Sequence, residues 1–333
     1  MREQSISIGA LPLECGETLR QVQQHVTVYG TPRNDGSNVV LINHALTGSS
    51  RAAEWWPGIV GDDALFDARD WCAIGMNALG SCYGSTGPSS LAPDGLTYGP
   101  RFPRITVGDM VRAQMRALDG IGVARVAFVA GGSLGGMQAL EWALAAPERV
   151  GCALIVGAHD HLSAMGIALN ALQREALALD AIRGLRLARK IAMLSYKSEE
   201  LLRQRHERRP DRNGVARFDV EGYLELQADR IEGRMDALTY AVLTGAMDAF
   251  DVRDREFNGP AGARRPSLLF VGIESDWLYR ARDVRAAAER FARRGFDARY
   301  LHVDSAHGHD AFLAETAALQ TLLMPFVRAC APC

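Results

Sequence analysis

Residues 126–142 read VAFVAGGSLGGMQALEW. The first part is a short apolar run, typical of a strand buried on both faces, and the last part has the spacing of a helix. Between them, residues 131–135 (GGSLG) fit the pattern G-x-S-x-G, in which glycines allow a tight strand-to-helix turn that exposes the serine hydroxyl. The spacing is not that of a Walker loop, which also needs Gly-Lys-Ser/Thr. We therefore predict that Ser133 is a nucleophile; a glycine-rich turn that serves only packing or phosphate binding is the alternative.

Other segments repeat the same unit of a short apolar run, a glycine-containing loop and a helical segment. This order is the signature of a parallel sheet. The strand candidates are residues 39–42, 71–74, 126–129, 153–156, 267–271 and 298–303. We therefore expect an α/β fold with a mostly parallel central sheet and helices on both faces.

The middle of the chain has a different pattern. Residues 162–247 are rich in Ala, Leu, Arg and Glu at helical spacing, with a break near residues 209–214. A linker containing Pro260, Gly262 and Pro266 precedes the return of the strand pattern. We predict that residues 1–160 and 261–333 form the core and that residues 161–260 are an inserted helical lid.

A serine nucleophile needs a general base, and the base needs an anion that orients it. In a sheet of this kind the acid and then the histidine follow the serine, each on a loop at the carboxyl end of a later strand. Asp276 follows the strand at 267–271, and His309 follows the strand at 298–303. We predict a catalytic triad of Ser133, Asp276 and His309.

Other residues compete for the base and the acid. His302 and His307 are rival bases, and Asp304 and Glu274 are rival acids. His309 is favoured because the flexible glycine before it suits a loop that projects a side chain toward the serine, whereas His302 lies inside a predicted strand. The alternative for His309 is a solvent-facing loop histidine, and the alternative for each acid is surface solvation.

The tetrahedral intermediate of acyl transfer needs two backbone N–H donors. One follows the nucleophile and the other comes from the loop after an early strand. Leu134 follows Ser133, and residues 44–48 (HALTG) form the early loop. Because both donors are backbone groups, the side chains at these positions need not be polar.

The composition favours an enzyme with small-molecule substrates. The chain of 333 residues has a formal net charge of -2, with 48% hydrophobic and 23% charged residues, so no excess charge attracts nucleic acid. The first 16 residues lack the basic start and apolar stretch of a signal peptide, and no segment approaches about 18 consecutive apolar residues. We expect a soluble cytoplasmic protein without nucleic-acid or membrane partners, and with reduced cysteines.

Two short patterns suggest a metal, and we predict none at either. Cys330 and Cys333 have the spacing of a zinc or redox pair, but without a second pair we interpret them as part of an inert tail. His159 and His161 would point to opposite sides of an extended segment, so residues 159–161 are better interpreted as a loop at a strand end.

Four blocks of the sequence resemble the homoserine O-acyltransferase family, whose members have the α/β-hydrolase fold. The blocks are residues 43–48 (NHALTG), 77–88 (NALGSCYGSTGP), 131–142 (GGSLGGMQALEW) and 308–313 (GHDAFL). The likeness covers most of the chain, and blocks of this length are far more specific than G-x-S-x-G alone.

The resemblance implies an L-homoserine O-acetyltransferase of methionine biosynthesis. Such an enzyme forms an acyl-serine from acetyl-CoA and passes the acyl group to the homoserine hydroxyl in a ping-pong scheme. The nearest alternatives are succinyl-CoA as donor and L-serine as acceptor; an esterase and a binding module that only retains the fold are more distant. The resemblance further implies acyl-CoA as co-substrate, no permanently bound cofactor, and a homodimer formed through the lid helices.

The resemblance also implies roles for individual residues. Leu46 and Leu134 would supply the oxyanion-hole amides, while Arg189, Tyr196 and Asp310 would hold the amino-acid substrate. An arginine can clasp a carboxylate in a bidentate pair, and an aspartate can accept an ammonium group. The alternative for Arg189 is a solvated helix face.

Some positions depart from the family pattern. Leu134 stands where methionine is common, Gly245 where arginine is frequent, and His307 where tyrosine is frequent. The lid is also shorter than usual. None of these positions belongs to the predicted triad, but Gly245 and the lid border the region where acceptor and acyl chain would be selected.

Overall fold

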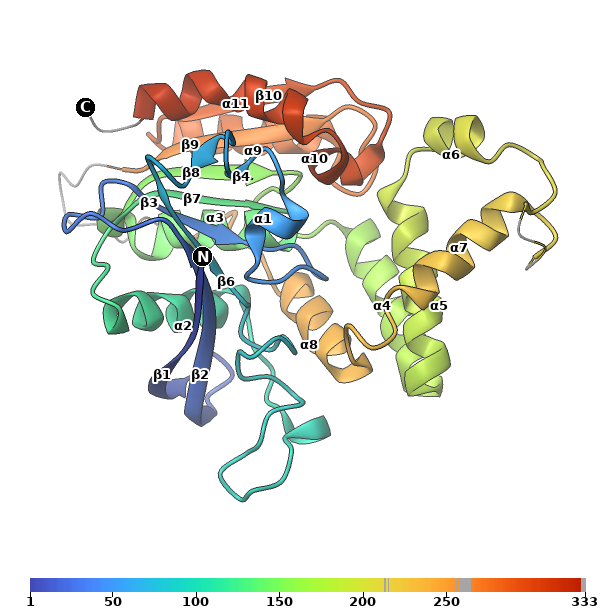
Figure 1. The fold of residues 1–333 in the computed structure, drawn as a ribbon, viewed down its shortest axis with the longest axis horizontal. Coiled ribbons are helices and arrows are strands. Elements are labelled where there is room, and N and C mark those ends of the chain that lie inside the picture. The colour runs from blue at the N-terminus through green and yellow to red at the C-terminus, as the bar shows by residue number, and fades with distance from the viewer. Residues whose placement is uncertain (213, 215, 256, 258–264, 331–333) are drawn as a thin grey trace.

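A single eight-stranded sheet forms the centre of the computed structural model, which describes residues 1–212, 214, 216–255, 257 and 265–330 (Figure 1). The strand order is β1-β2-β6-β3-β7-β8-β9-β10. The strands are β1 (Arg2–Pro12), β2 (Thr18–Tyr29), β3 (Val39–Asn43), β6 (Cys72–Met76), β7 (Val126–Gly132), β8 (Val150–Val156), β9 (Ser267–Ile273) and β10 (Ala298–Val303). Two short strands, β4 (Val60–Gly61) and β5 (Phe66–Asp67), pair separately.

The six strands from β6 to β10 in this order run parallel, as the sequence predicts. Each is a short apolar run because successive side chains enter different cores on the two faces of the sheet. In β3, Val39 and Leu41 pack into one core, and Val40 and Ile42 into the other. The predicted strands are all present, and their ends differ from the prediction by a few residues.

The antiparallel hairpin of β1 and β2 at one edge of the sheet was not predicted. β1 is largely exposed and polar, with only a partly buried alternation around Ile6 and Ile8. An edge strand that buries so little apolar surface leaves a weak periodic signal. β2 joins the hairpin to the parallel strands by pairing with β6.

Helices cover both faces of the sheet, which confirms the layered architecture (Figure 1). Those that contribute to the first core are α2 (Val107–Gly120), α3 (Leu134–Ala145) and α9 (Ala281–Arg293). Those that contribute to the second core are α1 (Ala52–Trp55), α10 (Ala311–Ala314) and α11 (Thr316–Cys330). Three 3-10 turns complete the core: η1 (Gly99–Arg101), η2 (Pro147–Arg149) and η3 (Gly308–Asp310).

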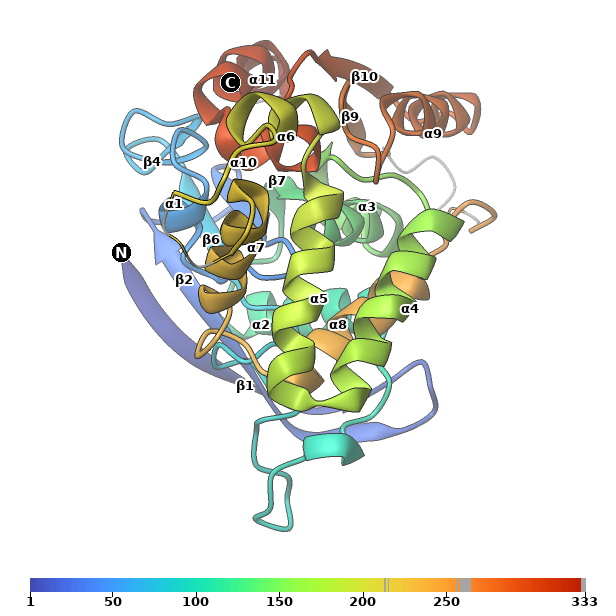
Figure 2. The ribbon, with the colours of Figure 1, turned by 90° about the vertical axis from the view of Figure 1, so that its right-hand side faces the viewer.

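The segment predicted as a lid is helical and lies to one side of the sheet (Figures 1 and 2). Its helices are α4 (Ala164–Leu179), α5 (Ala181–Tyr196), α6 (Glu199–Arg205), α7 (Asp219–Asp229) and α8 (Ala237–Asp248). Its buried side chains, such as Leu185 and Leu243, belong to the same hydrophobic core as α2 and α3. The domain boundaries stay predictions; Pro260 and Gly262, at the second boundary, lie outside the described residues.

The segment has a break at Asp180 that was not predicted, besides the one predicted near residues 209–214. Asp180 separates α4 from α5, and its carboxylate accepts hydrogen bonds from the Ile182 and Arg183 amides at 2.9 and 2.7 Å, a helix N-cap. α6 ends before the predicted break at 209–214, of which Asn213 lies outside the described residues. No helix in the described part of the chain is long and apolar enough to cross a membrane.

Gly75, in the sheet, allows the backbone at Ser50 to pass close to β6. A Cβ atom on Gly75, in β6, would overlap the carbonyl oxygen of Ser50, which lies just after the HALTG loop. Gly75→Ala is therefore expected to lower the free energy of unfolding by about 1–3 kcal/mol, as overpacking does. Urea unfolding measures the change.

Gly245→Ala is the matched control for Gly75→Ala. Gly245 lies inside α8, and a Cβ atom there would meet nothing within 4 Å. This replacement is expected to raise the free energy of unfolding by about 0.5–1 kcal/mol, because alanine favours a helix interior. Equal effects of the two replacements would contradict the close approach at Gly75.

Candidate active site

Ser133 lies at a strained turn between β7 and α3. Its backbone has φ +57° and ψ -123°, a conformation that a non-glycine residue rarely adopts. The turn is possible because the neighbouring residues are glycines, which have no side chain. A Cβ on Gly135 would overlap the Asn43 carbonyl oxygen. The strand, turn and helix that the sequence predicts around Ser133 are present, and they put its side chain at the start of a helix.

Asp276 and His309 meet in space although they follow different strands. Asp276 follows β9, His309 lies in η3 after β10, and both side chains are buried. His309 Nδ1 donates to Asp276 Oδ2 at 2.7 Å. The other carboxylate oxygen, Oδ1, accepts from the Leu278 and Tyr279 amides at 2.9 Å each. Asp276 is therefore held in one orientation and fixes the His309 ring.

The rival residues lie in other contacts. His302 Nε2 is 3.5 Å from Glu274 Oε2, on an exposed part of β10. His307 Nδ1 is 3.6 Å from Glu315 Oε1. These contacts separate the rival histidines from Asp276, so the pairing of His309 with Asp276 favours the predicted acid and base.

The His309 ring is surrounded by aromatic rings. Its centroid lies 5.1 Å from that of Tyr279, 5.5 Å from Tyr196 and 5.6 Å from Phe312. Burial alone would lower the pKa of His309, but the charge and hydrogen bond of Asp276, with the charge of Asp310, outweigh burial and raise the pKa above its ordinary value of 6.5. His309 Nε2 has no hydrogen-bond partner among the described residues, so it is available to take a proton.

Gly157, which follows the partner of the Ser133 amide, lies against the imidazole of His309. The Ser133 amide donates to the Val156 carbonyl at 2.9 Å, and a Cβ on the next residue, Gly157, would lie 3.3 Å from His309 Cε1. His309 Nε2 forms no hydrogen bond to Ser133 in this structure. Such contacts are often long in enzymes without substrate and shorten in the reacting complex.

Two backbone amides remain available as oxyanion donors. In the described part of the chain, neither the Leu46 amide nor the Leu134 amide donates a hydrogen bond. Leu134 is the first residue of α3, where amides have no partner within the helix. Leu46 and Ser133 both line one cavity.

This cavity is small and mostly apolar. Its volume is about 20 Å³, room for roughly one water molecule. It is lined by Leu46, Ser133, Leu162, Gly166, Leu169, Asn170, Gln173, Ser195, Tyr196, Met247, Leu278 and Tyr279. These lining residues include no carboxylate and no cation, so the space beside Ser133 suits a short uncharged group.

The residues implied to bind an amino acid lie around His309. Arg189 and Tyr196 are on α5, and the buried Arg189 Nε has no partner among the described residues. Asp310 follows His309, and its Oδ2 accepts from Lys197 Nζ at 2.6 Å. Sequence reasoning missed Lys197, whose only signal was its place directly after Tyr196.

Two tyrosines near this group were also missed. The hydroxyls of Tyr83 and Tyr223 are buried without a partner among the described residues. Burial, with the charge of Asp310, raises the pKa of Tyr223 to about 12 against the opposing charge of Arg189. Burial also raises the pKa of Tyr83, where Arg234 opposes most and Arg189 opposes less. The charge of Arg189 therefore acts on both hydroxyls. Tyr83 lies in the NALGSCYGSTGP block, which was the one available signal.

The end of α5 is joined to both loops that carry Asp276 and His309. Trp277 Nε1 donates to the Lys197 carbonyl at 3.1 Å, and the Ser198 hydroxyl donates to the Ala306 carbonyl. Gly308 has φ +66°, and a Cβ there would come within 2.7 Å of the Tyr196 carbonyl oxygen. The glycine before His309 is thus required by close backbone packing and a left-handed φ, and our explanation by loop flexibility was wrong.

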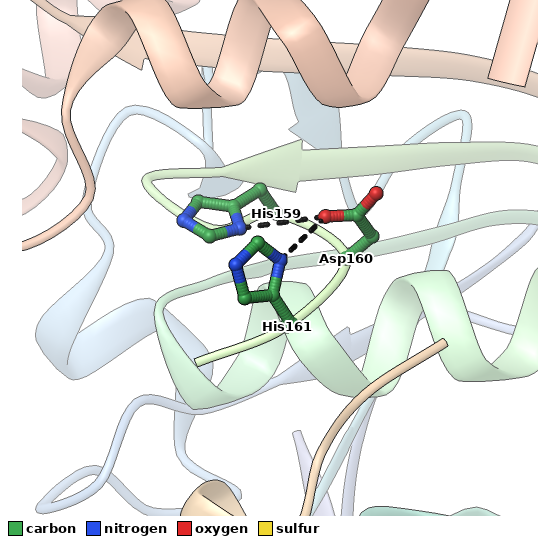
Figure 3. Close-up of side chains that lie close together, drawn as sticks. All are labelled: His159, Asp160 and His161. Carbon is green, nitrogen blue, oxygen red and sulfur yellow. Dashed lines mark hydrogen bonds and ion pairs between the residues drawn. The ribbon is translucent and has the colours of Figure 1, made fainter. Parts of the chain in front are cut away.

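His159, Asp160 and His161 form a compact cluster in the loop after β8 (Figure 3). The two histidine rings lie 4.7 Å apart, so our argument that they point to opposite sides was wrong, because the segment is a loop and not extended. Arg290 donates to both Asp160 oxygens at 2.8 Å. The carboxylate already has a cationic partner, and the absence of a metal stays a prediction. Cys333, the other candidate ligand, lies outside the described residues.

Comparisons with known proteins give consistent relatives. The family model described as "alpha/beta hydrolase fold" matches residues 38–316. A homoserine O-acetyltransferase of Chlorobaculum tepidum is 39% identical over 96% of this chain and 92% of its own length. A homoserine O-succinyltransferase of Litchfieldella anticariensis is 37% identical over 95% of this chain and 90% of its own.

Solved structures share the fold. A homoserine O-acetyltransferase from Bacillus anthracis superposes with a TM-score of 0.87 at 22% identity, covering 100% of this chain and 98% of that one. An acetylester hydrolase from Corynebacterium glutamicum gives 0.82 at 21% identity, covering 98% and 96%. At these identities the superpositions show the fold alone.

The Asp276–His309 pair predicts a pH dependence. Only neutral His309 can accept the serine proton, so the acylation rate should fall as the pH falls through the raised pKa of His309. In Asp276→Asn the larger effects that raise this pKa are lost and only that of Asp310 stays, so the acid limb should move to lower pH while the rate drops by about 10⁴-fold. Turnover of p-nitrophenyl acetate across pH measures both.

Glu274→Gln is the matched control, since it removes the carboxylate that faces the rival His302. Its pH profile should coincide with that of the unaltered protein. If the acid limb shifts in Glu274→Gln and stays in place in Asp276→Asn, our assignment of Asp276 as the partner of the catalytic base is wrong.

Proposed function

Because the chain belongs to the homoserine O-acyltransferases of the alpha/beta hydrolase fold family, we propose that it transfers an acetyl group from acetyl-CoA to the hydroxyl of L-homoserine. The observation that carries this proposal is the buried Asp276–His309 pair: its Nε2 has no partner among the described residues, and its ring lies against Gly157, which follows the partner of the Ser133 amide. This arrangement supports a serine nucleophile with His309 as its base and Asp276 as the orienting acid.

The proposed chemistry has two half-reactions with one set of residues. His309 Nε2 takes the proton of Ser133 as its oxygen attacks the thioester carbonyl, and the Leu46 and Leu134 amides stabilise the oxyanion. The carbon–sulfur bond breaks, and His309 returns the proton to the thiolate of CoA. The acceptor hydroxyl then gives its proton to His309 as its oxygen attacks the acyl-serine carbonyl. The bond between Ser133 Oγ and the acyl carbon breaks, His309 returns the proton to Ser133 Oγ, and the O-acyl product leaves.

The proposed acceptor site lies on the side of His309 formed by α5 and η3. Arg189 would clasp the carboxylate of the amino acid, and Asp310 would accept its ammonium group with Tyr196 beside it. Asp310 is paired with Lys197 at 2.6 Å in the absence of substrate. The substrate ammonium would therefore share this carboxylate with Lys197 or displace it.

The cavity beside Ser133 favours acetyl over succinyl as the acyl group. A succinyl group would bring a carboxylate next to the leucines and Met247 that line this cavity, and no lining residue is a cation. Succinyl transfer and transfer to L-serine remain the alternative reactions. The small volume of the cavity also favours transfer over hydrolysis, because it leaves room for only about one water molecule beside the acyl-serine.

We also propose a homodimer through the helices of the lid. Met165, Leu172 and Leu179 are exposed at intervals of seven residues on α4, and Leu187 and Leu194 at the same interval on α5. A seven-residue spacing keeps side chains on one side of a helix. α4 and α5 pack side by side (Figure 2), so together they offer an apolar surface that a second copy would cover.

The cellular setting follows from the proposed reaction. The product is an activated homoserine for methionine biosynthesis, and acyl-CoA is consumed as a co-substrate without a permanently bound cofactor or metal. Cys15, Cys72 and Cys82 carry free thiols, which suits a reducing cytoplasm.

Release of the free thiol of CoA tests the reaction. Acetyl-CoA and succinyl-CoA are each mixed with L-homoserine, with L-serine or with no acceptor. We expect rapid thiol release only from acetyl-CoA with L-homoserine, and a fall to background in Ser133→Ala.

The other combinations identify the alternatives. Release that needs L-serine or succinyl-CoA would replace the acceptor or the donor in our proposal. Equal release with and without an acceptor would identify a hydrolase and contradict it.

The dimer is tested by Leu172→Asp, which places a charge in the middle of the apolar surface on α4. Sedimentation velocity should show a dimer for the unaltered protein and a monomer for this variant. Leu96→Asp is the control, since Leu96 is similarly exposed but lies away from the lid helices. A monomer before any replacement would refute this interface.

A further inference from the structure

His44 is a buried histidine that the proposed reaction does not use. It follows β3 and begins the loop that leads to Leu46, and only 1% of its surface is exposed. Burial lowers its pKa to about 4, with the hydrogen bond to Ala45 opposing, so the ring is neutral at physiological pH. A neutral imidazole has one donor and one acceptor nitrogen.

The partners of the ring determine which nitrogen carries the proton. The Ala78 amide lies 2.9 Å from His44 Nε2, and an amide can only donate. Nε2 is therefore the acceptor, which puts the proton on Nδ1. His44 Nδ1 then donates to the Ala45 carbonyl oxygen at 2.7 Å.

That carbonyl belongs to the same peptide unit as the Leu46 amide. The described residues contain no cis peptide bond, so the Ala45 C=O and the Leu46 N–H point in opposite directions. The Gly48 amide also donates to the Ala45 oxygen, at 2.9 Å, which closes a turn. Two donors thus hold the carbonyl on one side and direct the Leu46 N–H to the other.

The second partner of His44 is itself fixed. Ala78 lies in the 77–88 loop, where the Asn77 amide donates to the His25 carbonyl at 3.0 Å. Asn77 Oδ1 accepts from the Ser50 amide at 2.6 Å, just beyond the HALTG loop. His44 therefore joins the oxyanion loop to a neighbouring braced loop.

We propose that His44 is a positioning residue that orients the Leu46 amide toward the oxyanion by holding the Ala45 carbonyl through its Nδ1–H. This inference rests on the proposed acyl transfer, in which Leu46 is an oxyanion donor. His44 touches no reacting atom and transfers no proton; it acts by preorganising one N–H for the charge that develops on the carbonyl oxygen.

Two variants separate the two contacts of His44. The side-chain nitrogen of Asn occupies about the place of Nδ1, so His44→Asn keeps a donor to Ala45 and loses the acceptor for Ala78. The side-chain oxygen of Gln reaches about the place of Nε2, so His44→Gln keeps the acceptor for Ala78 and loses the donor to Ala45. Each variant loses one buried hydrogen bond, so their thermal stabilities should fall alike.

Their kinetics should differ. We expect His44→Gln to lose about 10²–10³-fold in kcat with little change in KM for acetyl-CoA, the cost of losing one oxyanion donor, and His44→Asn to keep most of its kcat. Equal losses of kcat, a loss confined to KM, or losses that follow thermal stability would overturn the proposal.

The same variants are tested with p-nitrophenyl acetate, which reports acylation of Ser133 without homoserine. A difference between Gln and Asn in this assay supports the role of His44 even if homoserine is not the acceptor. If acylation proceeds equally in both variants while homoserine transfer works, the inference fails and the proposed function stands.

Nitrogen-15 NMR of the histidines gives a measurement that needs no variant. At least one of the eight histidines should stay neutral and protonated on Nδ1 from about pH 5 to 8. If no histidine does so, the proposal is wrong even where a variant fails to fold.

Discussion

The close approach of backbones at the Ser133 turn is the constraint on which the site depends. β3, β7 and the start of α3 come so near one another that glycines must occupy positions 131 and 135, and Ser133 has an unfavourable φ. The two cores on either side of the sheet hold these elements rigidly, so the strain at one residue is compensated by burial elsewhere. The serine is presented in a fixed direction, and the loops after β3, β9 and β10 are arranged around it.

Much of this could be read from the sequence because the signals are local. A G-x-S-x-G motif between an apolar run and a helix defines its own geometry, and the order of serine, acid and histidine follows from the parallel sheet. Position after a strand end did not by itself separate Asp276 and His309 from their rivals, because Glu274 and Asp304 directly follow the same two strands; the hydrogen bond between His309 and Asp276 separates them. The strands buried on both faces gave the clearest pattern, whereas the exposed β1 gave almost none.

The rest depends on contacts between distant segments. Lys197 reaches Asp310 across 113 positions of the chain, and nothing local to either residue predicts this pair. The same holds for Gly308, whose need for glycine comes from the backbone of α5 packed against it. Our prediction that His159 and His161 point to opposite sides was wrong because it assumed an extended segment. The loop after β8 brings their rings together.

The lid and the core contribute different parts of one site. The core carries Ser133, Asp276 and His309, while α4, α5 and α8 line the space beside Ser133 with residues such as Leu169, Tyr196 and Met247. In the proposed reaction, an acyl-serine formed there has room for only about one water molecule beside it. Transferases and hydrolases share this fold, so the fold does not separate the two classes. In our proposal, the limited access of water to the acyl-serine makes the difference.

The central claim is that Ser133 itself carries the acyl group between donor and acceptor. Mass spectrometry of the protein mixed briefly with acetyl-CoA, without any acceptor, tests this directly. We predict one acetyl group on the peptide that contains Ser133, and its loss when L-homoserine is added. Product formation with no acetyl group ever detected on Ser133, or with the group on another residue, would contradict the account.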